Sequence, residues 1–178
     1  MWWYEELFCI LSLGFLAGGC YYFYLIFCPL LIYLSLRYHS PAAILISILL
    51  ITLAYSKLEF SPNKKFLNSW IFRVWREYFK FEYDMTRSKF EFKDRKYVFL
   101  QFPHGVSPIG QFLACSIYQQ ALAGEMVCGI GADILFIVPI IRQVISWVGL
   151  RPASRRNISN IVLEGYHVAI IPGAFYLV

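Results

Sequence analysis

The sequence predicts an α/β protein in which an N-terminal, membrane-embedded helical hairpin precedes an α/β domain with a mostly parallel sheet. Three observations predict it: two long apolar blocks lie near the N-terminus, a basic segment follows them, and short apolar runs then alternate with helical stretches. These features divide the chain into a hydrophobic hairpin over 1–56, a basic amphipathic interfacial segment over 57–96 and an α/β part over 97–178.

The composition separates this chain from soluble and disordered proteins. Of its 178 residues, 59% are hydrophobic and 15% are charged, against about 45–50% and about 25% in soluble domains. This excludes a disordered chain, a coiled coil and an ordinary water-soluble globule. The five cysteines show no C-x-x-C spacing and three lie in the most apolar stretch, so we expect buried thiols rather than a disulfide framework or a metal site.

The two apolar blocks have the length of membrane spans. Leu7–Leu36 contains thirty residues without a charged or histidine side chain. Tyr38–Ser56 adds nineteen residues, among which His39 is the one charged or histidine side chain. A span needs about 20 apolar residues. The first block is too long for one straight helix, so we expect a kink at Gly18–Gly19 or at Pro29. The short connection between the blocks predicts a hairpin, and the acidic start without basic residues indicates a retained anchor rather than a cleaved signal peptide.

Charge orients the rest of the chain. Residues 57–97 contain eleven of the sixteen Lys and Arg residues against six acids, so the positive-inside rule places them in the cytosol. A nucleic-acid partner is not expected, because the basic charge lies beside the apolar blocks and is mixed with acids. Within this zone, Phe66–Phe81 has the spacing of one amphipathic helix with an aromatic surface. We expect it at the membrane–water boundary; a core-facing helix is the alternative.

From Lys96 onward, strand and helix patterns alternate. Expected strands are Tyr97–Phe102, Met126–Ile130 and His167–Ile171, and Leu150–Ala153 is expected as an extended segment. The helices between them run from an N-cap at Ser107 and a first residue at Pro108 to near Gly124, from Ile134 to Val148 with a bend or start at Pro139, and from a cap at Ser154 to Gly165. This alternation predicts a largely parallel sheet.

Ligands of parallel sheets bind beyond the carboxyl ends of the strands. Two turns are expected there, Phe102–Gly105 and Ile171–Ala174. The first contains His104, shortly before a helix whose positive N-terminus keeps an imidazole neutral, as a general base requires. Gly105 lets a substrate approach the backbone. The alternative is a structural histidine in a turn.

Several motifs in order resemble one enzyme family. The segment Tyr97–Gly105 is similar to a strand that ends in His-Pro-His-Gly, with His104 on the second histidine. Further matches are a following Gly-x-Phe, a central Pro…Arg…Gly…Ser-Arg segment and a final glycine-rich strand end, at Gly110, Phe112, Pro139, Arg142, Gly149, Ser154–Asn157, Gly165 and Pro172–Gly173. With the apolar hairpin and its aromatic segment, this set resembles the type-2 diacylglycerol acyltransferase family, which includes monoacylglycerol and wax-alcohol acyltransferases.

The resemblance implies transfer of a fatty acyl group from acyl-CoA to a diacylglycerol or related lipid alcohol, without a bound cofactor or metal. Acyl-CoA, the lipid acceptor and membrane lipids are the implied partners, and a second copy of the chain is kept open. The implied location is the endoplasmic reticulum membrane or the lipid droplet, with the catalytic part in the cytosol. His104 and Gly105 are the expected catalytic residues, and the expected substrate-binding residues are Phe102, Pro103, Arg142, Ser154, Arg155, Arg156, Pro172 and Gly173.

Two arginines and three acids have open roles. Arg155 and Arg156, at a helix start, suit the phosphates of coenzyme A; a solvated or lipid-facing charge pair is the alternative. Glu125, Asp133 and Glu164 are the candidates for a carboxylate that orients His104.

The chain also departs from the family pattern. Phe102 stands at the first family histidine, and the Pro-Gly-Gly-x-x-Glu stretch continues here with Ala174 and stops at Val178. A chain truncated at its C-terminus, with an incomplete α/β domain, is therefore expected. A catalytically silent paralogue or gene fragment that binds membrane lipid is the alternative.

Overall fold

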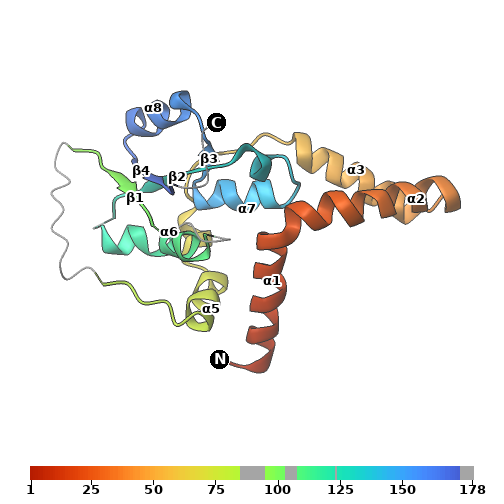
Figure 1. The fold of residues 1–178 in the computed structure, drawn as a ribbon, viewed down its shortest axis with the longest axis horizontal. Coiled ribbons are helices and arrows are strands. Elements are labelled where there is room, and N and C mark those ends of the chain that lie inside the picture. The colour runs from red at the N-terminus through yellow and green to blue at the C-terminus, as the bar shows by residue number, and fades with distance from the viewer. Residues whose placement is uncertain (85–94, 103–107, 123, 173–178) are drawn as a thin grey trace.

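The computed structural model describes residues 1–84, 95–102, 108–122 and 124–172. Its centre is a four-stranded sheet of β1 (Val98–Leu100), β2 (Val127–Gly131), β3 (Arg151–Pro152) and β4 (His167–Ile170), in the order β1-β4-β2-β3. All three pairings are parallel. The expected parallel sheet is confirmed (Figure 1). β1, β3 and β4 are shorter than the expected segments, and β2 keeps the expected length but is shifted by one residue.

Helices cover both faces of this sheet. On one face, α6 (Ile109–Ala121) packs Ala114 and Tyr118 onto Val127 and Ala169. On the other, α8 (Arg155–Leu163) packs Ile161 against its neighbours in the strands, Cys128 and Val168. Consecutive strand residues therefore point to opposite faces, as a pleated strand requires, and the α/β part has a two-sided core (Figure 1).

One helix start differs from the expectation, and one helical stretch is broken where the sequence predicts it. The structure begins α6 at Ile109 and places Pro108 at the N-cap position, whereas Ser107, the expected cap, lies outside the described residues. The helical stretch expected over 134–148, with a bend or start at Pro139, is divided into the short 3-10 helix η2 (Asp133–Phe136) and α7 (Ile141–Val148), so the expected break is confirmed. The break is at Pro139–Ile140, because proline cannot continue the hydrogen-bond ladder of a helix.

The aromatic segment after the hairpin forms two helices, not one. Asn63 caps α4 (Lys64–Leu67) through its side chain, and Ser69 takes the N-cap position of α5 (Trp70–Tyr78). Three residues of α5, Phe72, Val74 and Trp75, are buried. The expectation that this surface faces a membrane is wrong for these three, which match the core-facing alternative, whereas Trp70 and Phe79 stay exposed.

The partner of α5 is the N-terminal helix α1 (Trp3–Tyr22). Cys9 and Leu13 share a core with Phe72, Val74 and Trp75. Two indole N–H groups add polar links, since Trp75 Nε1 donates to Ser12 Oγ at 2.9 Å and Trp70 Nε1 donates to Glu5 Oε1 at 3.3 Å. One stripe of α1 is thus part of the protein core, and its other side, with Leu7, Ile10, Leu11 and Phe15, is exposed.

Beyond α1, the apolar chain forms a hairpin that projects from the α/β part (Figure 1). A π-helical turn, η1 (Phe23–Phe27), leads into α2 (Cys28–Tyr38), and α3 (Pro41–Tyr55) returns after a tight turn capped by Ser40. The segments Trp3–Gly19 and Phe23–Tyr38 meet at 81°, near the kink expected at Gly18–Gly19. Among the described residues, no single helix has the length and apolar character to cross a bilayer, although this bent pair does in length and composition.

Candidate active site

The ends of β1 and β4 lie side by side, so the two expected turns begin at neighbouring positions. Leu100 pairs with Ile170, and Gln101 N donates to Ile170 O at 2.9 Å. The chain then continues to Phe102, whose side chain is 67% exposed, and to Pro172. The two segments therefore leave the sheet at neighbouring positions of its carboxyl edge, as the sequence predicts.

Four of the expected site residues fall outside the described part of the chain. These are Pro103, His104, Gly105 and Gly173. Their catalytic and binding roles stay predictions from the sequence.

The start of α8 lies on the same edge of the sheet. β3 pairs parallel with β2, and Ala153 N donates to Gly131 O at 3.0 Å just beyond both strands. Ser154 then caps α8 by accepting a hydrogen bond from Asn157 N at 3.1 Å, so the expected cap is confirmed. Arg155 and Arg156 are exposed on the first turn. Three strand spacings, about 14 Å in all, separate β1 from β3, so Phe102, just after β1, and the arginine pair lie toward opposite ends of the carboxyl edge.

Arg142, an expected substrate-binding residue, donates hydrogen bonds to the protein backbone. It lies in the first turn of α7, and its guanidinium donates to backbone carbonyls of the α3 end, including Leu53 O at 2.7 Å. Its Nε donates to Phe136 O at 3.1 Å. These donors are thus engaged with the protein backbone.

The three candidate carboxylates have different positions. Glu125 precedes β2 and lies at the amino edge of the sheet, 3.5 Å from Lys96 Nζ. Glu164, at the C-terminal end of α8, forms an ion pair with Arg151. Asp133 begins η2 directly after the carboxyl end of β2. Of the three, Asp133 is the one that shares an edge with Phe102 and Pro172.

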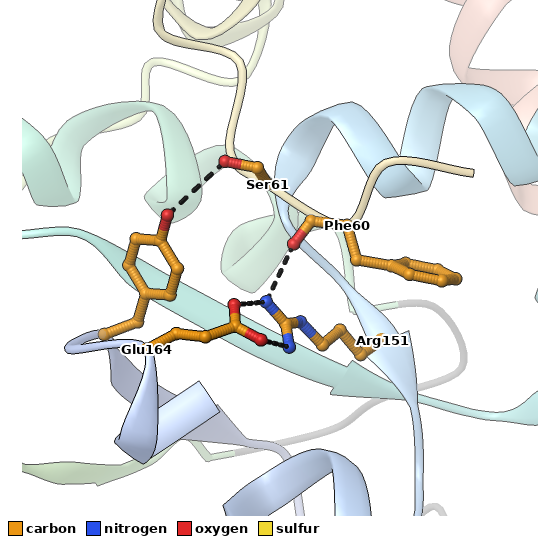
Figure 2. Close-up of polar contacts among 5 residues, drawn as sticks. Phe60, Ser61, Arg151 and Glu164 are labelled. Carbon is orange, nitrogen blue, oxygen red and sulfur yellow. Dashed lines mark hydrogen bonds and ion pairs between the residues drawn. The ribbon is translucent and has the colours of Figure 1, made fainter. Parts of the chain in front are cut away.

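A polar cluster around Arg151 was not predicted from the sequence (Figure 2). The buried Arg151 side chain forms a two-point contact with Glu164, in which Nη1 donates to Oε1 at 2.9 Å and Nη2 to Oε2. Nη2 also donates to Phe60 O at 3.0 Å, and Ser61 Oγ lies 3.5 Å from the Tyr166 hydroxyl. The Arg151 guanidinium lowers the pKa of Glu164 by hydrogen bonding and charge. The cluster holds the segment after the hairpin against β3 and α8.

His167 is a second unpredicted polar residue. It is fully buried at the start of β4, where its Nδ1 accepts a hydrogen bond from Tyr97 N at 3.1 Å. Because Nδ1 is the acceptor, the proton of the neutral ring is on Nε2, which lies 3.3 Å from Glu125 Oε2. His167 is at the amino edge of the sheet, opposite the candidate site. The local sequence has no signal for it, since its contacts depend on strand pairing.

Stability should depend on the protonation of His167. Burial lowers the pKa of its imidazole, Lys96 lowers that pKa further, and Glu125 opposes both. The unfolded chain then binds a proton at higher pH than the folded chain, so the free energy of unfolding should fall as pH drops below about 6.5. We expect urea unfolding at pH 7.5 and 5.5 to show a larger loss in the wild type than in His167→Asn, whose amide oxygen can still accept from Tyr97. An equal loss in both would contradict this account.

The thiols and potential metal ligands give no competing site in the part that the structure describes. Burial raises the pKa of Cys115 and of Cys128 to about 12, so neither is a thiolate near neutral pH. Within the same part, no three His, Cys, Asp or Glu side chains are grouped to hold a metal ion.

One family model matches most of the chain. A family model described as diacylglycerol acyltransferase matches residues 35–175. The match runs from the end of α2 through the whole sheet and includes both segments at the carboxyl edge. No solved structure matches the chain.

Proposed function

The chain belongs to the diacylglycerol acyltransferase family, and from this premise we propose that it transfers a fatty acyl group from acyl-CoA to the hydroxyl of a diacylglycerol-type lipid. The observation that supports the proposal most is the parallel pairing of β1 with β4, which starts the Phe102–Gly105 and Pro172–Gly173 segments side by side. A carboxyl edge of this kind is where parallel sheets bind ligands.

In the proposed reaction, neutral His104 is the general base. Its imidazole takes the proton of the acceptor hydroxyl while the hydroxyl oxygen attacks the thioester carbonyl carbon. The carbon–sulfur bond then breaks, an ester is formed, and the leaving thiolate receives the proton from the imidazolium. Because a thioester is already activated, no covalent enzyme intermediate is needed. Backbone N–H groups at Gly105 or Gly173 would stabilise the developing oxyanion.

Two further groups at the edge fit this reaction. Arg155 and Arg156 are exposed on the first turn of α8, beside the partial positive charge of its N-terminus, and would bind the phosphates of coenzyme A. Asp133 would orient the imidazole of His104, because the structure engages Glu125 and Glu164 elsewhere. Phe102 and Pro172 would line the acyl path.

The acceptor would reach this edge from the membrane. Members of this family are membrane-associated lipid enzymes, and much of the apolar surface of α2 and α3 is exposed. Such a surface needs an apolar partner. We place the hairpin in the endoplasmic reticulum membrane or on a lipid droplet, with the sheet on the cytosolic side, so that a diacylglycerol arrives laterally.

The test is the incorporation of labelled oleoyl-CoA into neutral lipid by membranes that contain the 178-residue chain. We expect labelled triacylglycerol above the level of membranes without the chain. If the chain is present and folded in the membranes but adds no label, the proposal is overturned in favour of a silent lipid-binding relative.

A further inference from the structure

The carboxyl end of α3 is capped by side chains from α7. The last carbonyls of a helix have no partner within the helix. Here, Leu53 O accepts from Arg142 Nη1 at 2.7 Å and from Gln143 Nε2 at 2.8 Å. Arg142 Nη1 also donates to Ala54 O and, at 3.2 Å, to Ser56 O, while Gln143 Nε2 donates to Ser56 Oγ at 3.1 Å. A positive charge at this end also complements the helix dipole.

A strained turn places these two side chains. Ile140 has φ 70° and ψ −55°, and Ile141 N donates to Pro139 O at 2.8 Å. This is the rare γ-turn of positive φ, which a β-branched residue adopts only where its surroundings impose it. Gln143 Oε1 accepts from Ile140 N at 2.7 Å. The same amide thus holds the turn with its oxygen and the end of α3 with its nitrogen.

The cap joins two parts that are far apart in the sequence. Arg142 and Leu53 are 89 residues apart, and α3 lies in the hairpin that projects from the sheet (Figure 1). Nearby contacts continue the attachment, since Asn63 N donates to Trp147 O at 2.7 Å and Gly19 lies against the Ile141 side chain. Arg142 also donates from Nε to Phe136 O, at the end of η2.

We propose that Arg142 and Gln143 are positioning residues that fix the hairpin at its angle to the sheet, rather than contacts to acyl-CoA. Two independent observations support this: the backbone carbonyls that occupy Arg142, and the strained turn that presents both side chains. The contact itself does not depend on the reaction. The effect of this contact on catalysis rests on the proposed function, because the angle of the hairpin would set how a lipid acceptor in the membrane reaches the carboxyl edge.

The first readout is amide hydrogen exchange of the full chain in lipid nanodiscs. In Arg142→Gln, we expect amides of the last turn of α3 to exchange about tenfold faster, which corresponds to the loss of one hydrogen bond to a charged group. Gln143→Glu is a milder variant that keeps the acceptor for Ile140 N but loses the donor to Leu53, and it should act in the same direction. Arg73→Gln, on the exposed side of α5, is the matched control and should leave this exchange unchanged.

The second readout separates positioning from substrate binding. We expect Arg142→Gln to raise the KM for membrane-borne diacylglycerol and to leave both the KM for oleoyl-CoA and the binding of free coenzyme A unchanged. Unchanged exchange at the end of α3 in both variants would overturn the proposal, and so would weaker coenzyme A binding in Arg142→Gln. If the wild type transfers no acyl group, the proposed reaction fails, whereas the exchange and coenzyme A measurements still decide this inference.

Discussion

Replacing His104 by alanine should lower acyl transfer by about 10²- to 10⁴-fold, the usual contribution of a general base. Without the imidazole, the acceptor hydroxyl has no group to take its proton as it attacks the thioester. Membrane association should not change, because the exposed apolar surface of α2 and α3 is intact. The measurement is labelled oleoyl-CoA incorporation at equal chain content, with sedimentation of the membranes as the test of association.

His39 supplies the control for this prediction. It lies in the turn between α2 and α3 with φ 47°, a conformation that asparagine also adopts readily. His39→Asn therefore removes a histidine from the hairpin without straining the turn, and its transfer rate should match the wild type. A wild-type rate in His104→Ala would remove the catalytic assignment, and an equal loss in both variants would point to damage of the fold.

Replacing Arg151 by alanine should lower the free energy of unfolding by about 2–4 kcal/mol. The change removes the two-point contact with Glu164 and the hydrogen bond to Phe60 O, and it leaves a gap where the buried side chain packs. We give the lower part of the range more weight, because Glu164 is 47% exposed and regains water. Urea unfolding in detergent or nanodiscs measures the loss.

The matched control for Arg151 is Arg73→Ala. Arg73 Nε lies 4.0 Å from Glu77 Oε1, and both side chains are at least half exposed. Such surface pairs contribute little, so the variant should stay within about 0.5 kcal/mol of the wild type. An Arg151→Ala protein as stable as Arg73→Ala would show that the cluster in Figure 2 does not hold the segment after the hairpin.

The sequence was sufficient for the parallel sheet and for the edge at which the segments of Phe102 and Pro172 leave it. Short apolar runs separated by helices leave few other arrangements, and the structure pairs β1 with β4 accordingly. Ser154 could be predicted as a cap because its signal is local: an N-cap side chain binds an amide three residues ahead.

The contacts that local sequence signals do not predict join segments far apart in the chain. Arg142 and Arg151 look like free cations in the sequence, yet they donate to Leu53 O and Phe60 O, which are 89 and 91 residues away. The burial of Phe72 and Trp75 against α1 has the same origin, because it depends on tertiary packing between distant segments. The positive φ of Ile140 contradicts the local preference of a β-branched residue and becomes intelligible only with α3 in place.

The most direct test of the account is photocrosslinking with an acyl-CoA that carries a diazirine near its thioester, mapped by mass spectrometry on the chain in nanodiscs. We expect labelled peptides that contain residues 101–105 and 170–173, with loss of label when unmodified oleoyl-CoA competes. Label confined to the amino edge of the sheet, around Glu125 and His167, or to the hairpin alone would contradict it.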